Sequence, residues 1–126
     1  MNDDDTRRAV RAYYESWKDG ASAFDEARLR STMAPDLTFE GPIAGVTRGV
    51  EAFIPGLVQF ARGLERFRPL QLLVAGEEAA SLYECDLSAP AGTYRFAEFF
   101  RVRGGRVKLL RLVFDATEFK KRLPPH

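Results

Sequence analysis

The chain has 126 residues and a mass of 14.2 kDa, and 45% of its residues are hydrophobic. This length suits one core, and we expect a single domain over residues 1–126. Nineteen Lys and Arg residues nearly balance eighteen Asp and Glu residues, which leaves a net charge of +1. A strong positive field is therefore excluded, and nucleic acid is not an expected partner.

Residues that commonly carry catalysis or bind metals are scarce. Cys85 is the single cysteine, so neither an intramolecular disulfide nor a CxxC motif can form. The single histidine, His126, is the last residue, where chains usually fray, which argues against imidazole catalysis and most zinc sites. The glycines form neither GxGxxG nor a phosphate-binding loop, so we expect no metal and no cofactor.

The N-terminal sequence and the hydropathy pattern bear on location. The chain starts with Met-Asn-Asp-Asp-Asp, which is unlike a positively charged signal peptide. No apolar run approaches the about 18 residues that a membrane span needs. We therefore expect a cytoplasmic protein without membrane contact.

Helical periodicity dominates the first half of the chain. The first predicted helix is capped by Asp5 or Thr6, runs to about Lys18, and is ended by Gly20. Its apolar stripe comprises Val10, Tyr13, Tyr14 and Trp17.

Two further helices are predicted. Ser22 with Asp25 resembles a capping box that opens the second helix, and Pro35 forbids its continuation. The third covers residues 50–64, with either a kink at Pro55 or a later start.

From Phe67 onward the apolar period changes to two, which indicates strands. The predicted strands are 37–40, 68–75, 79–87, 93–103 and 106–115. Gly104 and Gly105 form the shortest turn between them. Three helices followed by a meander predict an α+β domain, in which a curved antiparallel sheet is wrapped by three N-terminal helices.

Glu98 is the one charge on an otherwise apolar strand face. That face also carries Tyr94, Phe96, Phe100 and Val102. A buried carboxyl group must either pair with a donor or keep its proton at a raised pKa, and both states can serve acid–base chemistry. The structural alternative is that Glu98 accepts from Tyr13 or Tyr14, or pairs with an arginine, and only organises the core.

The chain resembles the SnoaL-like branch of the nuclear transport factor 2-like superfamily. The resemblance rests on the phrases MAPDLTFEGP at residues 33–42 and RGVEAF at residues 48–53, and on the order of elements along the whole chain. It implies a cone-shaped domain with an internal apolar pocket, often a homodimer. The superfamily includes ketosteroid isomerases, limonene epoxide hydrolases, scytalone dehydratases, polyketide cyclases and non-catalytic members, so fold alone does not choose the chemistry.

The resemblance also assigns roles to residues. Against ketosteroid isomerase, Glu98 falls at the oxyanion-hole aspartate and Tyr13 near the oxyanion-hole tyrosine. Gly41 stands where that enzyme has its base, and Glu40 belongs to the opposite strand face. A limonene epoxide hydrolase site would need Arg111 with Asp36 and Glu98, although alternation points Arg111 away from the apolar face.

Two hypotheses follow for function. In the first, a small hydrophobic molecule with a carbonyl or hydroxyl group is isomerised, dehydrated or cyclised, with Glu98 and Tyr13 as catalytic residues. In the second, the protein binds such a ligand without turnover or is a structural homodimer, because Gly41 supplies no base. The predicted substrate-binding residues are Tyr14, Trp17, Phe39, Phe53, Phe60, Tyr83, Cys85, Phe96, Phe100, Leu112 and Phe114.

Overall fold

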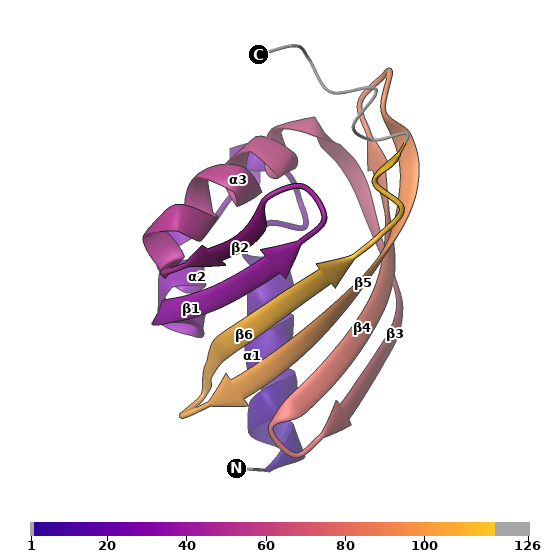
Figure 1. The fold of residues 1–126 in the computed structure, drawn as a ribbon. Helices are drawn as coiled ribbons and strands as arrows, with labels where there is room; N and C mark the ends of the chain where they lie inside the picture. The colour runs from indigo at the N-terminus through magenta and orange to yellow at the C-terminus, as the bar shows by residue number, and fades with distance from the viewer. Residues whose placement is uncertain (1, 118–126) are drawn as a thin grey trace.

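The computed structural model describes residues 2–117 (Figure 1). Its helices are α1 (Asp3–Glu15), a short 3-10 helix (Ala21–Ala23), α2 (Glu26–Thr32) and α3 (Val50–Gly63). Its strands are β1 (Met33–Gly41), β2 (Gly45–Arg48), β3 (Leu64–Ala75), β4 (Glu78–Leu87), β5 (Gly92–Arg103) and β6 (Arg106–Val113). None of these helices is both long enough and apolar enough to cross a bilayer. His126 lies outside the described residues.

The six strands form one curved sheet in the order β2-β1-β6-β5-β4-β3, and α1 crosses its concave face (Figure 1). The α+β class is confirmed. Every neighbouring pair is antiparallel except β1 and β6, which run parallel, with Phe39 opposite Leu110. The parallel pair arises because α3 carries the chain to the far edge, and the meander returns with β6 in the direction of β1.

Helix α1 begins earlier than predicted. The cap is Asn2, whose side-chain oxygen accepts from the Asp5 backbone N–H at 2.9 Å, so the predicted cap at Asp5 or Thr6 is wrong. Thr6 is fully buried, and its hydroxyl donates to the Gly76 carbonyl at 2.5 Å. The Thr6 hydroxyl, which the sequence pattern predicts to cap the helix, instead bonds to a residue that is distant in the chain.

The boundaries after α1 also differ in detail. The predicted capping box is wrong: Asp25 itself is the N-cap of α2 and accepts from the Arg28 N–H at 3.0 Å, whereas Ser22 lies in the preceding 3-10 helix. Strand β1 starts at Met33, not at residue 37, because the β1–β6 register shifts before Thr38 and so accommodates Pro35. The connector after β1 contains strand β2, which the sequence did not predict.

Helix α3 and the meander follow the predicted pattern more closely. Pro55 lies inside α3 on its exposed side, and β3 starts at Leu64, four residues before the prediction. The Gly104–Gly105 turn is confirmed, with φ of 58° and 77°. Burial alternates along β5, so the predicted inward row that contains Glu98 is confirmed, and burial alternates along β4 as well. Strand β6 ends at Val113 and does not reach Asp115.

Candidate functional site

The most unusual group in the core is the carboxyl of Glu98. It lies on β5 between Ser81 of β4 and Leu112 of β6, and it is 2% exposed. The Tyr14 hydroxyl donates to Oε1 at 2.7 Å, and the Tyr13 hydroxyl donates to Oε2 at 3.5 Å. Within residues 2–117 no cation forms an ion pair with it. Tyrosine hydroxyls therefore stabilise the buried carboxyl group of Glu98, whereas most buried carboxylates are stabilised by a cation.

The surroundings of Glu98 raise its pKa into the neutral range. Burial raises the pKa of Glu98 to about 7, while hydrogen bonds from Tyr14, Tyr83 and Tyr13 pull it down. Burial, followed by the nearby Glu98 charge, raises the pKa of each of these tyrosines well above its ordinary value. The tyrosines thus stay protonated and donate, while Glu98 can gain or lose a proton.

Ring contacts hold the two helix tyrosines in place. The Tyr13 ring lies 5.7 Å from Phe100 and 6.3 Å from Phe53, centroid to centroid. The Tyr14 ring lies 5.3 Å from both Phe67 and Tyr83. Such packed aromatic arrangements restrict the side chains to one position, so the hydroxyls are already directed at the carboxyl group.

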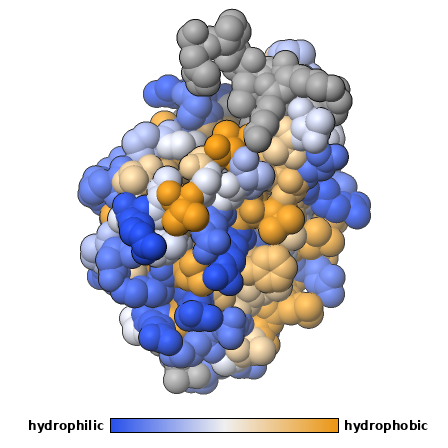
Figure 2. Space-filling model, viewed as in Figure 1, coloured by the Kyte–Doolittle hydropathy of each residue, from blue (hydrophilic) through white to orange (hydrophobic). Residues whose placement is uncertain are grey.

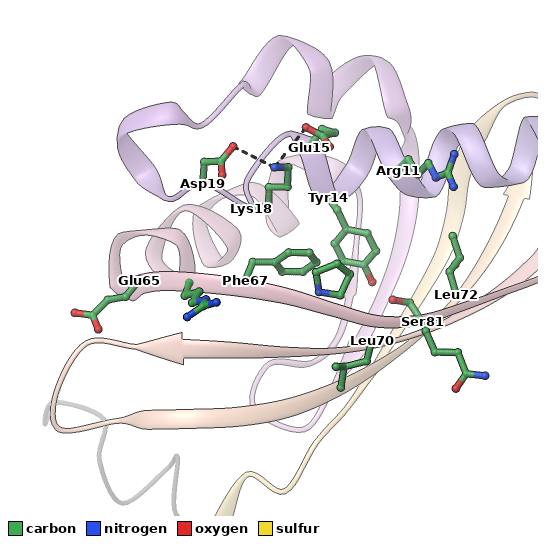
Figure 3. A pocket seen from close by; sticks show the side chains of 13 residues that line it. Arg11, Tyr14, Glu15, Lys18, Asp19, Glu65, Phe67, Leu70, Leu72 and Ser81 are labelled. Atoms are coloured by element: carbon green, nitrogen blue, oxygen red, sulfur yellow. Dashed lines mark ion pairs between the residues drawn. The ribbon is translucent and has the colours of Figure 1, made fainter.

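A groove of about 740 Å³ runs between α1 and β3, at the edge of the sheet (Figure 3). We call it the α1–β3 groove; it is lined by Arg11, Tyr14, Glu15, Lys18, Asp19, Glu65, Arg66, Phe67, Pro69, Leu70, Gln71, Leu72 and Ser81. Figure 3 shows the Tyr14 hydroxyl directed toward Ser81, and a hydrogen bond from Ser81 lowers the pKa of Tyr14. Tyr14 therefore has its ring on the groove wall and its hydroxyl on Glu98.

The predicted site residues divide into two groups. Tyr14 lines the α1–β3 groove. Other predicted residues pack on one another in the core: the Trp17 ring lies 5.7 Å from Phe60, and the Tyr83 ring 5.3 Å from Phe96. Phe53, Cys85 and Phe100 belong to the same core, and Phe39, Leu112 and Phe114 are partly buried and pack against it. Burial raises the pKa of the Cys85 thiol, which keeps it protonated.

Of the residues that line the groove, the sequence analysis named only Tyr14 as a site residue, and Phe67, Leu72 and Ser81 are among those it missed. Phe67 and Leu72 both line the groove although five positions separate them, because the β3–β4 register shifts between Pro69 and Gln71. Simple alternation cannot find such a pair. Ser81 had a usable signal, since its position directly across from Glu98 follows from pairing the two inward rows.

Two mechanisms considered from the resemblance lack their residues in place. A Cβ added at Gly41 would lie 2.9 Å from Cζ of Phe39, so the Phe39 ring already fills the space beside this position. Arg111 donates to Glu40 at 3.0 Å on the exposed side of the sheet. The prediction from alternation that Arg111 points away from the apolar face is therefore confirmed, and Asp36 pairs with Lys108, so Arg111, Asp36 and Glu98 do not form one site.

The fold and this site define an α+β domain that holds a protonatable carboxyl group in an aromatic core. The SnoaL-like domain family matches residues 10–110, and the chain belongs to this family. No curated protein matches the chain.

Solved structures share the fold. A protein from Kribbella flavida DSM 17836 has 25% identity and a TM-score of 0.80 over 90% of this chain and 89% of its own. A putative SnoaL-like polyketide cyclase from Jannaschia sp. CCS1 has 16% identity and a TM-score of 0.78, covering 98% and 95%. A putative polyketide cyclase from Sinorhizobium meliloti has 22% identity and a TM-score of 0.71, covering 90% and 100%. These likenesses confirm the nuclear transport factor 2-like fold.

Proposed function

We propose that the α1–β3 groove binds a small apolar molecule bearing a carbonyl or hydroxyl group, and that Glu98 exchanges a proton with it through Tyr14. The observation that carries this proposal is the double position of Tyr14, which lines the groove and donates to Glu98 at 2.7 Å. Isomerisation, dehydration and cyclisation all need such an exchange. Tyr13 then has a positioning role, because its hydroxyl holds the second carboxylate oxygen.

The proposed reaction is a proton relay in which Tyr14 passes a proton between the ligand and Glu98. When Glu98 is ionised, a proton leaving the ligand passes to the Tyr14 oxygen as the Tyr14 proton passes to Oε1 of Glu98. The reverse transfer returns a proton to the ligand. Because the pKa of Tyr14 is far above its ordinary value, the two transfers occur together without a lasting phenolate. The pKa of Glu98 near 7 suits both directions at neutral pH.

The second candidate function is ligand binding without turnover. The packing around Gly41 favours it, because the Phe39 ring leaves no room for a second carboxylate there. A single carboxyl group can exchange protons, but it must then serve as both acid and base.

Hydrogen exchange distinguishes the two candidates. The probe is 2-tetralone, an apolar ketone with acidic C–H groups, whose exchange in heavy water is followed by NMR. We expect wild-type protein to accelerate exchange, with a rate that rises with pH and levels off above about 7, because the carboxylate is the accepting form.

Variants of individual residues show which side chains accelerate the exchange. Glu98→Gln and Tyr14→Phe should each lower the catalysed rate by about 100-fold or more. Tyr13→Phe should cost less, since its hydroxyl is 3.5 Å away. Glu40→Gln is the matched control, because Glu40 lies on the outer face with Arg111. Probe binding without accelerated exchange would establish the binding function, and full activity of Glu98→Gln would disprove the relay.

A further inference from the structure

The ionisable side chains of the α1–β3 groove are not all paired with one another. Lys18 Nζ lies 3.9 Å from Glu15 and 3.4 Å from Asp19, so one cation holds two carboxylates. Figure 3 shows Asp19 and Glu65 at one end of the groove and Arg11 and Leu72 at the other. The end of the groove near Lys18 therefore carries charges of both signs, and Arg11 stands at the other end.

Arg11 lies on the same helix as Tyr14 of the proposed relay. It precedes Tyr14 by three positions on α1, which places both side chains on one side of the helix. Among residues 2–117 it takes part in no ion pair, whereas the adjacent Arg7 and Arg8 pair with Asp4 and Asp5. The Arg11 guanidinium can therefore bind an anionic ligand, and Arg11 lies about one helical turn before Tyr14 on α1.

A second, smaller hollow adjoins the groove at Arg11. Its volume is about 420 Å³, and it shares Arg11 and Glu15 with the groove. Its lining residues are Asp4, Arg7, Arg8, Arg11, Ala12, Glu15 and Arg28. Arg7, Arg8 and Arg28 pair with Asp4, Asp5 and Asp25, so among residues 2–117 Arg11 is the arginine of this hollow that takes part in no ion pair.

We propose, on the basis of the function proposed above, that the ligands of the groove are apolar carboxylates. The ring or chain of the ligand lies over Phe67 and Leu72, its oxygen meets Tyr14 and Ser81, and its carboxylate binds Arg11. A guanidinium presents paired N–H donors that match a carboxylate, and the exposed Arg11 side chain is open to such a ligand.

The test compares two probes that share one skeleton, 3-phenylpropanoate and 3-phenylpropan-1-ol. Binding is measured by the fluorescence of Trp17, the single tryptophan, whose ring lies 5.4 Å from the groove residue Phe67. We expect wild-type protein to bind the carboxylate about tenfold more tightly than the alcohol, and salt to reduce this preference.

Two charge-removing variants locate the preference. Arg11→Gln should bring the carboxylate to the affinity of the alcohol and leave the alcohol unchanged. Arg48→Gln, on β2 at the opposite edge of the sheet, removes the same charge and should keep the preference. Equal binding of the two probes to wild type, or a preference that survives Arg11→Gln, overturns the carboxylate inference alone. Failure of both probes to bind overturns the groove proposal as well.

Discussion

At the scale of single residues, Glu98 couples the stability of the fold to its own protonation. Its ordinary pKa is near 4.5, and burial raises the value to about 7 in the folded protein. The folded state therefore binds this proton more tightly than the unfolded state. Below about pH 4.5 both states are protonated and the contribution of Glu98 is fully favourable; it is lost as pH rises through about 7.

This linkage predicts that the free energy of unfolding falls between about pH 4.5 and about pH 7, by roughly 3 kcal/mol for a shift of this size. Urea unfolding across that range measures it. Glu98→Gln should flatten the profile, while Glu40→Gln should keep the wild-type slope. The pKa values of Asp36, Glu51 and Asp86 are lowered by their cationic partners, so these carboxylates stabilise the fold above their ordinary pKa values of 3.8 and 4.5, and this contribution is lost as the pH falls further. An equal slope in wild type and Glu98→Gln would rule out Glu98 as the source.

At the scale of elements, the first turn of α1 is fastened to the β3–β4 turn at Gly76. The Thr6 hydroxyl donates to the Gly76 carbonyl, and the Gly76 N–H donates to the Asp3 carboxylate at 2.7 Å. Gly76 has a φ of 63°, a conformation that suits glycine. This contact fixes the start of the helix that carries Tyr14 two turns later.

Thr6→Val tests the fastening, because it keeps the shape of the side chain and removes the donor. We expect a loss of about 1–3 kcal/mol in the free energy of unfolding, since the Gly76 carbonyl loses its buried partner. Thr6→Ser restores the hydroxyl and should recover most of the stability. Chemical denaturation measures both variants, and wild-type stability of Thr6→Val would contradict this account.

Elements were predictable from the sequence where local pattern decided them. Alternation along β4 and β5 placed Glu98 inward, and Gly104 with Gly105 fixed a turn. Other features could not be predicted from local pattern, because they depend on contacts between segments that are distant in the chain. The sequence pattern predicts Thr6 as a helix cap, but its hydroxyl donates to Gly76, which is distant in the chain. The register shift after Pro69 places Phe67 and Leu72 on the same side of β3, which simple alternation does not predict. The Tyr14–Glu98 bond was one of several open pairings, and only tertiary geometry selects it.

At the scale of the whole molecule, the convex face of the sheet carries exposed hydrophobic residues. Leu73, Phe99 and Val113 are 58%, 48% and 56% exposed, and Leu73 and Phe99 flank Ala80 in one row across β3, β4 and β5. Figure 2 shows hydrophobic residues gathered over these strands, with hydrophilic residues around them. The rim includes the pair of Arg95 with Glu84. An apolar centre inside a charge-balanced rim suits a second copy of the same face.

We therefore expect a homodimer formed through this face. Phe99→Glu places a charge at its centre and should shift the protein to monomer, measured by light scattering across a concentration series. Ile43→Glu is the matched control, because Ile43 is 44% exposed but lies in the turn between β1 and β2. A monomeric wild-type protein, or dimer retained in Phe99→Glu, would refute this interface.

The parallel pairing of β1 with β6 constrains the order in which the chain folds. Glu40 and Arg111, which lie side by side, are 71 residues apart, whereas β3 to β6 join neighbours through short turns. During synthesis, β1 has only β2 beside it until the end of the meander has left the ribosome. We therefore expect the contact that closes the largest loop to form last and to slow folding. Until then one edge of β1 stays open to other chains, and slow synthesis after β5 prolongs that exposure.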